Sequence, residues 1–474
     1  MHDKQQLRSG FIWSAIDSFG NQAIGLVISL ILANFLGPSV YGLIAMLAIF
    51  IAIANVFVNS GFGTALIRKI DRNQSDFATT FYFSLAVAVI CYLLLYIIAP
   101  YISDFYNQPE LTYLTRVLGL IIVINTFTII PRVLLTVKLN FKAQAMCNIT
   151  SLICSGTMAL SLAYLDYGVW ALVGQQMTSA FINTIMLNIV APWRPQMVFC
   201  KKSFKELFGF GSKLLLSGLL DTIYNNAYSV IIGKQYSAAQ LGFFNQANIL
   251  SSTPAMTLTA IIQKVTYPML SNLQDDTKKL DEAYLLTLQF SAIVIFPVMF
   301  GVCIIAKPLI AVLLGAEWQG SAELISIITM ALVLYPIHAI NLNMLQVKGR
   351  SDLFLKLEII KKLMMTVMLI ITVPLGIKAM CYGMVITSYL ALFVNTYYTG
   401  KLSSITAVKQ LTTLLPIGIV TLISAEIGYE IGLQVNGNAM QIATILTTSL
   451  IVYLAAMLLF QRPLLIRLKK VVFV

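Results

Sequence analysis

The sequence predicts an all-α integral membrane protein of about 14 transmembrane helices, and three features lead to that fold class. Of its 474 residues, 58% are hydrophobic and only 11% are charged, which is too apolar for the surface of a water-soluble domain. Apolar runs of about 20 residues, enough to cross a bilayer core of roughly 30 Å as a helix, recur along the whole chain. Basic residues gather in every second connection between these runs.

The apolar runs define the expected helices in order. Each is followed by a short connection that contains charged residues, glycine or proline, as expected between helices. They cover residues 11–34, 40–64, 77–98, 111–136, 144–164, 168–191, 208–233, 240–265, 283–306, 320–346, 353–374, 378–399, 409–430 and 438–461.

The alternation of charge predicts the orientation. Basic connections include residues 68–72 and 201–205, whereas the opposite connections carry Asp104, Glu110 and Asp166. Lysine and arginine accumulate in cytoplasmic connections, so both termini are predicted to be cytoplasmic and the number of membrane crossings to be even. Topology thus accounts for the net charge of +12, and we expect no nucleic-acid partner.

Two pairs of similar segments indicate an internal duplication. Leu-x-Val-Lys occurs at 135–138 and again at 345–348, and LGPSVYG (36–42) resembles YSAAQLG (236–242). A parallel repeat of this kind is typical of transporters, in which a site between two halves opens to either side. We therefore expect two six-helix bundles around a central cavity, followed by two extra helices and a basic cytoplasmic tail, with boundaries at 1–200, 201–408 and 409–474.

Polar residues at steps of four recur in the first run of each predicted bundle. Such a row inside a membrane is costly unless it faces water or polar partners, so it either lines a hydrated cavity or joins neighbouring helices. The rows are Trp13, Asp17, Asn21, Gly25 and Ser29, and Lys213, Ser217, Asp221, Asn225 and Ser229. Candidate substrate contacts are Asp17, Asn21, Gln22, Lys213, Asp221, Asn225 and Asn226.

Two further titratable residues lie within predicted helices. Arg116 could hold a phosphate in the cavity, or extend to the outer headgroups. His338 could titrate in a proton-coupled cycle, or hydrogen-bond a neighbouring helix near Asn341. Asp221 and His338 are therefore candidates for a coupling ion.

No enzymatic motif is present in the sequence. GFGSK (209–213) lacks the spacing of a phosphate-binding loop, and no metal-ligand pattern or nucleophile motif occurs. We expect no cofactor. Transport would be driven by a proton or sodium gradient, by the membrane potential or by consumption of the product.

Several segments together resemble the Wzx-like oligosaccharide and polysaccharide flippases of the multidrug/oligosaccharidyl-lipid/polysaccharide superfamily. They are LANFLGPSVYGLIAM (32–46), SGFGTALI (60–67), YSVIIGKQYSAAQLGFFNQA (228–247), YPMLSNLQDD (267–276) and HAINLNMLQVKGRSDLFLK (338–356). The resemblance implies a carrier that moves an undecaprenyl-pyrophosphate-linked oligosaccharide to the outer leaflet for surface polysaccharide synthesis, such as O-antigen, capsule or colanic acid. It also implies contact with membrane lipids and with polymerase or chain-length machinery.

The sequence departs from the resemblance at one point, and two other functions remain open. Many relatives carry an acidic residue one turn before IIGK, where this chain has Tyr228 and Ser229, so a carboxylate-coupled cation site there is doubtful. A multidrug exporter of the same superfamily would favour a cavity dominated by carboxylates. A membrane polysaccharide polymerase or ligase would need larger outer connections than this chain has.

Overall fold

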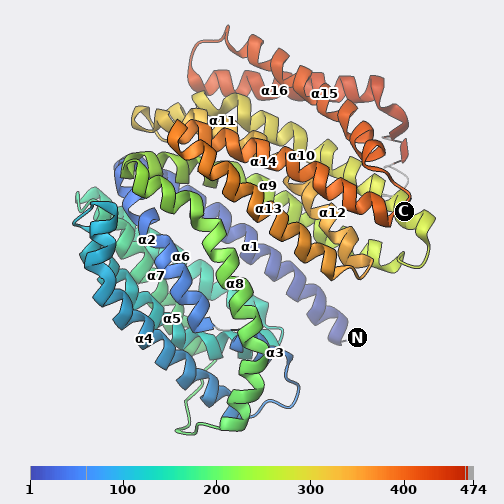
Figure 1. Cartoon of the computed structure of the whole chain (residues 1–474). Coiled ribbons are helices and arrows are strands. Elements are labelled where there is room, and N and C mark those ends of the chain that lie inside the picture. The colour runs from blue at the N-terminus through green and yellow to red at the C-terminus, as the bar shows by residue number, and fades with distance from the viewer. Residues whose placement is uncertain (1, 60, 465, 468–474) are drawn as a thin grey trace. The chain divides into compact units, whose positions relative to one another are not determined.

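The structure, a computed structural model, describes residues 2–59, 61–464 and 466–467 (Figure 1). Within these ranges every regular element is a helix and no strand occurs, which confirms the all-α class. Lys469 and Lys470 of the predicted basic tail lie outside the described residues.

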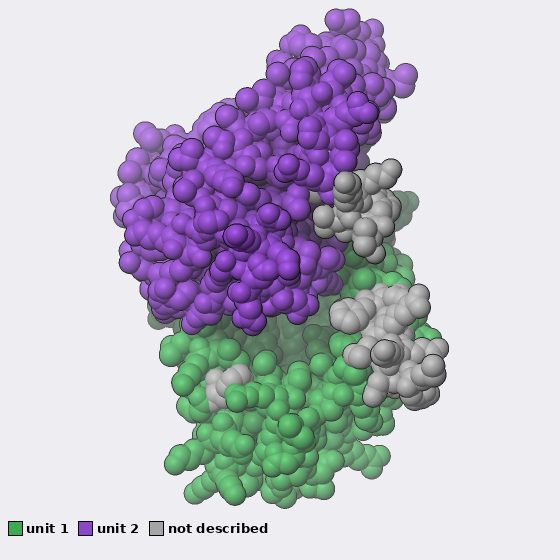
Figure 2. All heavy atoms as spheres, turned by 90° about the vertical axis from the view of Figure 1, so that its right-hand side faces the viewer, with its two compact units in different colours: residues 1–242 green, residues 243–474 purple. Residues whose placement is uncertain are grey.

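The chain forms two compact units, residues 1–242 and 243–474 (Figure 2). The first contains α1 (His2–Phe35), α2 (Pro38–Asn59), α3 (Phe62–Arg68), α4 (Gln74–Tyr106), α5 (Leu111–Val137), α6 (Phe141–Tyr164), α7 (Val169–Val190), α8 (Lys201–Gln235) and the start of α9 (Ala238–Asn272). The second contains the rest of α9, α10 (Thr277–Leu313), α11 (Gln319–Leu332), α12 (Tyr335–Val347), α13 (Ser351–Thr372), α14 (Ile377–Leu402), α15 (Ala407–Gly432) and α16 (Asn438–Phe460).

Each predicted run falls on one helix, with two exceptions. The run expected at 40–64 is divided between α2 and α3, and Gly61 has a left-handed φ of 69° just before α3. The run expected at 320–346 is divided between α11 and α12. Pro336 lies in the first turn of α12. Proline lacks a backbone N–H, and at this position the N–H would have no partner within the helix, so a new helix can begin here.

Ten helical segments in the described part of the chain are long and apolar enough to cross a membrane. The chain is therefore a multi-pass membrane protein. The other four long helices, α7, α8, α9 and α13, carry more polar residues. The number of 14 crossings, like the orientation of the termini, stays a prediction.

The order and the boundaries of the helices repeat along the chain. Helix α1 ends at Phe35 and α2 begins at Pro38; exactly the same gap separates Gln235 at the end of α8 from Ala238 at the start of α9. In the same way α4 to α7 correspond to α10 to α14, with α11 and α12 together matching α5. Helices α15 and α16 follow as an addition. The repeat boundaries predicted at 200 and 408 remain predictions, since the compact units divide the chain at 242 instead.

The recurring Leu-x-Val-Lys segment ends a helix in both copies. After α5, the N–H groups of Leu139 and Asn140 donate to Thr136 O and Leu135 O. After α12, Gly349 and Arg350 donate in the same pattern to Gln346 O and Leu345 O. The residue after each lysine is left-handed, with φ of 54° at Leu139 and 69° at Gly349. This is the Schellman arrangement, which satisfies the last carbonyls of a helix.

The other recurring segment makes a reciprocal contact within the first unit. A Cβ atom on Gly42 would lie 1.8 Å from the Ala238 carbonyl oxygen, and one on Gly242 would lie 1.9 Å from the Pro38 carbonyl oxygen. Each glycine therefore lets its helix approach the start of the other. Because Gly42 and Pro38 correspond to Gly242 and Ala238, the contact has the local twofold character that a duplication produces.

Packing within each unit follows from the apolar faces. In the first unit α1 packs on α6, α6 on α7, α4 on α5, and α8 on α2, α3 and α4. A cluster around Phe62, Leu66 and Phe81 joins α3 and α4 to α5 and α8. In the second unit, α10 is central and contacts α11, α12, α15 and α16.

Candidate functional site

Two neighbouring cavities with polar walls lie among the helices of the first unit. The larger, of about 310 Å³, is lined by α5, α6 and α7; the smaller, of about 140 Å³, is lined by α2 and α5. They share Asn125, Thr128 and Arg132 on one face of α5. These residues are three and four positions apart and so project from the same side of the helix.

Most of the residues that line the two cavities carry an amide or a hydroxyl group, and one carries a positive charge. From α7 come Gln175, Gln176, Ser179 and Asn183; α6 contributes Ser155, and α2 contributes Asn55 and Asn59. Among the described residues that line the two cavities, Arg132 is the only charged one. Such walls can hydrogen-bond hydroxyl-rich or phosphorylated ligands, which apolar walls cannot do.

Arg132 lies near the end of α5, five positions before Val137. It is solvent-exposed although its helix is otherwise packed on α4, α6 and α7. Its charge interacts favourably with that of Asp17. A guanidinium in this position keeps its charge under all physiological conditions and offers a planar array of donors to an anion.

A chain of hydrogen bonds connects α1 to the wall of the larger cavity. Asn21 Nδ2 donates to Asp17 Oδ1 at 2.7 Å, and Asn148 Nδ2 donates to the same oxygen at 3.0 Å. Asn183 Nδ2 in turn donates to Asn148 Oδ1 at 3.0 Å. Asn183 Oδ1 is buried and finds no hydrogen-bond partner within the described part of the chain. A buried acceptor of this kind calls for water or a ligand donor.

The polar row predicted on α1 is therefore turned toward α6. Asp17 and Asn21 are brought together one helical turn apart and joined to Asn148, while Gln22 is exposed. The row on α8 has a different setting: Lys213, Asp221 and Asn225 are all exposed. Asn226 is half-buried and donates to Thr222 O of its own helix at 2.8 Å.

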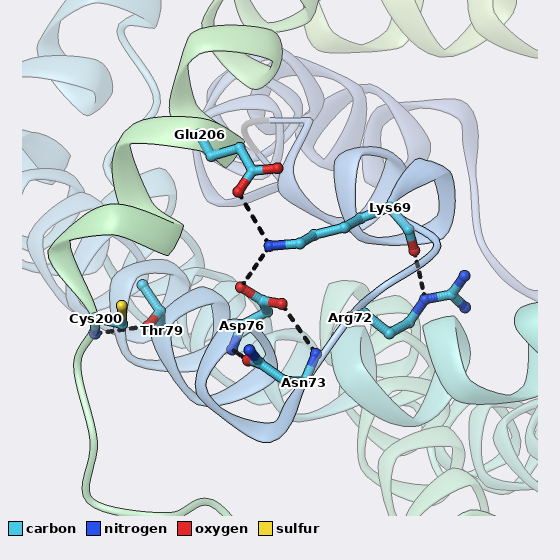
Figure 3. A network of polar contacts seen from close by, with 7 residues as sticks. All are labelled: Lys69, Arg72, Asn73, Asp76, Thr79, Cys200 and Glu206. Carbon is cyan, nitrogen blue, oxygen red and sulfur yellow. Dashed lines mark hydrogen bonds and ion pairs between the residues drawn. The ribbon is translucent and has the colours of Figure 1, made fainter.

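An ion-pair network joins the start of α8 to the start of α4 and the loop before it, within the first unit (Figure 3). Lys69 Nζ lies 3.1 Å from Asp76 Oδ1 and 3.0 Å from Glu206 Oε2 of α8. Asp76 is fully buried and forms a capping box with Asn73 at the start of α4. Thr79 Oγ1 accepts from the Cys200 N–H at 3.0 Å, just before α8 begins.

The electrostatics of this network favour the charged lysine. Burial lowers the pKa of Lys69, but its hydrogen bonds and the charges of Glu206 and Asp76 raise it by more, so the pKa lies above its ordinary value. At the other end of α8, Lys234 Nζ donates to Phe105 O at 2.6 Å. Both ends of α8 are thus bound to α4 or its flanking loop.

The remaining predicted site residues lie apart from the cavities. The Arg116 guanidinium lies over the Tyr96 ring, 4.3 Å from its centre, and its buried Nε finds no hydrogen-bond partner among the described residues. His338, in the second unit, lies 3.2 Å from Ser388 Oγ and 3.1 Å from Asn395 Nδ2, both on α14. Within the described residues no group of three or more His, Cys, Asp or Glu is placed to hold a metal ion.

The second unit has a polar cluster of its own, which is fully buried. The Tyr284 hydroxyl lies 3.0 Å from both Asn341 Oδ1 and Gln410 Oε1. Thr399 Oγ1 donates to Asn341 Oδ1 at 2.8 Å and accepts from Gln410 Nε2 at 3.1 Å. Helices α10, α12, α14 and α15 are therefore joined by a closed set of polar contacts.

Sequence reasoning missed the main features of the cavities. Arg132 lies inside the apolar run expected at 111–136, but the count of charges groups it with Lys138 and Lys142 in a basic cytoplasmic connection. Gln175, Ser179 and Asn183 repeat at steps of four, the same pattern that drew attention to α1 and α8. Applying that test to every run would have indicated α7.

Comparison with known proteins identifies the family. Residues 31–323 match the family described as polysaccharide biosynthesis protein, which is more than half of the chain. The chain belongs to this family. It is 24% identical over 351 residues to the teichuronic acid biosynthesis protein TuaB of Bacillus subtilis (strain 168), covering 74% of this chain and 73% of that protein. It is 22% identical over 366 residues to the lipopolysaccharide biosynthesis protein WzxC of Escherichia coli (strain K12), covering 76% and 73%.

Solved structures confirm the type of fold. The chain superposes on the lipid II flippase MurJ in an inward closed conformation with a TM-score of 0.75 and 15% identity, over 96% of this chain and 100% of that one. It matches an inward-facing multidrug resistance transporter of the MATE family and MOP superfamily with a TM-score of 0.64 and 18% identity, over 81% and 94%. The chain of this polysaccharide biosynthesis family therefore has the fold of these MOP-type transporters.

Proposed function

We propose that this transporter moves an undecaprenyl-pyrophosphate-linked oligosaccharide from the cytoplasmic to the outer leaflet of the bacterial inner membrane, with both termini in the cytoplasm. The observation that carries the proposal is the pair of polar cavities around Arg132. The flippase and polysaccharide-synthesis names of the similar proteins agree with it.

The cavity chemistry matches the parts of such a cargo. A pyrophosphate needs a cation at membrane depth, and the Arg132 guanidinium can bind two of its oxygens at once. Sugar hydroxyls need donors and acceptors, which the side chains of Asn125, Gln175 and Asn183 supply. The lipid tail can stay in the bilayer, so the protein needs no large apolar pocket for it.

The position of Arg132 near the end of α5 fits entry of the cargo from the cytoplasm. It precedes the end of α5 that leads into the basic connection containing Lys138 and Lys142. That connection is on the predicted cytoplasmic side, where the cargo is made. The carboxylate of Asp17, which is held by Asn21 and Asn148, interacts favourably with the charge of Arg132.

The other predicted residues have secondary places in this proposal. The exposed row Lys213, Asp221 and Asn225 on α8 forms a polar path for the cargo, together with Gln22 and Asn226. Arg116 is a second phosphate site toward the opposite end of α5. Asp221 and His338 are the groups through which a proton or sodium ion would be coupled. Polymerase and chain-length proteins would receive the product.

Reconstitution tests the role of Arg132. Lipid-linked oligosaccharide extracted from the producing cells is placed in vesicles, and its movement is followed by accessibility of the glycan to an added glycosidase. Arg132→Gln should slow movement at least tenfold because the phosphate loses its charge-assisted contacts, which are worth about 1.5–3 kcal/mol. Arg132→Lys should retain more activity than Arg132→Gln. Lys138→Gln removes a charge from the end of the same helix and is the matched control.

Lipid analysis of a deletion strain separates the alternative functions. A flippase predicts accumulation of lipid-linked repeat units that face the cytoplasm. Accumulation on the outer leaflet would instead indicate a polymerase or ligase. Unchanged lipids with a new sensitivity to cationic drugs would indicate a multidrug exporter, although an arginine-lined cavity repels such drugs.

A further inference from the structure

A third cavity lies at the opposite end of α5 from Arg132. It has a volume of about 590 Å³ and is bounded by the starts of α2, α5 and α7. This volume is within the range of small-molecule sites, roughly 300–1,000 Å³. Glu110, directly before α5, and Arg132 are separated by about 33 Å along the helix at 1.5 Å per residue. The cavity is thus on the predicted outer side.

The walls of this cavity combine aromatic rings with carboxylates. Tyr113, Tyr167 and Trp170 line it, with exposed fractions of 67%, 56% and 42%. Glu110 and Asp166 line it too and are exposed. The turn before α7 is fixed by two left-handed residues, Asp166 with φ of 59° and Gly168 with φ of 54°. Asp166, Tyr167 and Trp170 are therefore held close together by the backbone.

Aromatic residues near a membrane surface often serve only as interfacial anchors. Tyr113, Tyr167 and Trp170, however, line a cavity that Glu110 and Asp166 also line. An interfacial anchor facing lipid would not need carboxylates beside it. Carboxylates disfavour a phosphate but accept hydrogen bonds from hydroxyl groups strongly. The C–H face of a pyranose ring packs on an aromatic ring, whose face carries partial negative charge. Together these features describe a site for sugars.

We propose that this cavity binds the glycan part of the cargo as it reaches the outer side. This inference rests on the proposed function for its direction and its cargo. The same bundle would then have two chemically distinct sites: a cationic one at Arg132 for the pyrophosphate, and an acidic, aromatic one for the sugars. The glycan leaves the cationic cavity and is received by a site whose own walls carry carboxylates and aromatic rings.

Binding to the purified full-length protein tests the inference without transport. The probe is the oligosaccharide that mild acid releases from the lipid-linked repeat units of the producing cells, titrated by calorimetry. Wild type should bind it. Trp170→Ala should weaken binding at least tenfold, and Glu110→Gln combined with Asp166→Asn several-fold. Tyr101→Ala, which removes a 70% exposed tyrosine outside the cavity walls, should bind like wild type.

Several results would overturn the inference. It fails if wild type does not bind the released oligosaccharide, if the cavity variants bind as well as wild type, or if Tyr101→Ala weakens binding as much as Trp170→Ala. Because the Gln and Asn substitutions keep shape and remove charge only, they remain informative even if Trp170→Ala misfolds. Inorganic pyrophosphate should not compete for the site.

The same material distinguishes this inference from the proposed function. If wild type flips lipid-linked oligosaccharide in vesicles while the cavity variants bind the free glycan normally, the inference falls and the flippase stands. If wild type binds the free glycan through Trp170 but moves no lipid-linked oligosaccharide, the site stands and the flippase proposal falls.

Discussion

Two groups of polar residues, one in each unit, differ in whether their side chains are paired. In the first, amides and hydroxyls of α5, α6 and α7 border cavities around Arg132, and Asn183 Oδ1 is left without a partner among the described residues. In the second, Tyr284, Asn341 and Thr399 are fully buried, and they bond to one another and to Gln410. The cavities of the first unit leave space for a ligand, whereas the Tyr284 cluster of the second unit is closed.

This difference shows how one duplicated plan can serve two purposes. Asn341, on α12, occupies the second-repeat counterpart of the α5 segment that carries Arg132, since α11 and α12 match α5. A closed polar cluster fixes helix positions, because every broken contact leaves a group without a partner. A set of polar groups that faces a cavity lowers the stability of the fold, but it provides groups that can bind a ligand. We infer that the Tyr284 cluster is a firm support for the second unit and that the cavity walls of the first unit handle cargo.

The largest expected loss of stability comes from a substitution of Gly42, where α2 contacts the start of α9. Gly42→Val would place side-chain atoms against the Ala238 backbone, where even a Cβ would lie 1.8 Å from the carbonyl oxygen. We expect loss of several kcal/mol of stability, because the backbone cannot yield as a flexible side chain does. Fluorescence-detected size exclusion should show little folded protein. Gly25→Ala, with no atom within 4 Å of its added Cβ, is the control.

A smaller effect is expected from opening the closed cluster. Tyr284→Phe removes the hydroxyl that lies 3.0 Å from Asn341 Oδ1 and Gln410 Oε1. We expect a cost of about 1–3 kcal/mol in stability, because buried acceptors lose their donor. Ser179→Ala at the cavity wall of the first unit should cost less than about 0.5 kcal/mol, since water can replace the group. Equal decreases in the thermal midpoint would contradict the contrast between the units.

The smallest effect concerns the attachment of α8. The raised pKa of Lys69 means that its charged form stabilises the fold fully below the unfolded value of about 10.4. That contribution is lost as the pH rises through the higher folded value. Because Glu206 is 56% exposed, the gain is about 1 kcal/mol or less. Lys69→Met should lower the thermal midpoint at pH 8, and this difference from wild type should shrink as the pH rises through the raised pKa of Lys69. A difference that stays constant with pH would exclude this role.

Much of the fold could be predicted because membrane helices have long apolar runs that are visible in the sequence. The alignment of Pro38 with Ala238 and of Lys138 with Lys348 could also be recognised, since turn residues and close-contact glycines leave local patterns. The break before Pro336 was less clear, because a proline can bend a helix without dividing it.

The site was harder to predict. Counting charges groups Arg132 with a connection, although the run expected at 111–136 contains it and α5 continues to Val137. Sequence alone cannot tell which side of a polar helix meets water: the similar rows of α1 and α8 differ in the structure, with Asp17 bound to Asn148 and Asp221 exposed. That distinction depends on which neighbours pack on each helix, and it arises only in three dimensions.

Thiol labelling measures most directly whether the larger cavity of the first unit is open and the polar cluster of the second unit is closed. In a cysteine-free background, Ser179→Cys on the larger cavity wall and Thr396→Cys, buried in the second unit, would be treated with a membrane-impermeant reagent from the cytoplasmic side. We predict that residue 179 reacts and is protected by added lipid-linked oligosaccharide, while residue 396 stays unreactive. An unreactive residue 179, or protection that Arg132→Gln does not reduce, would contradict the account.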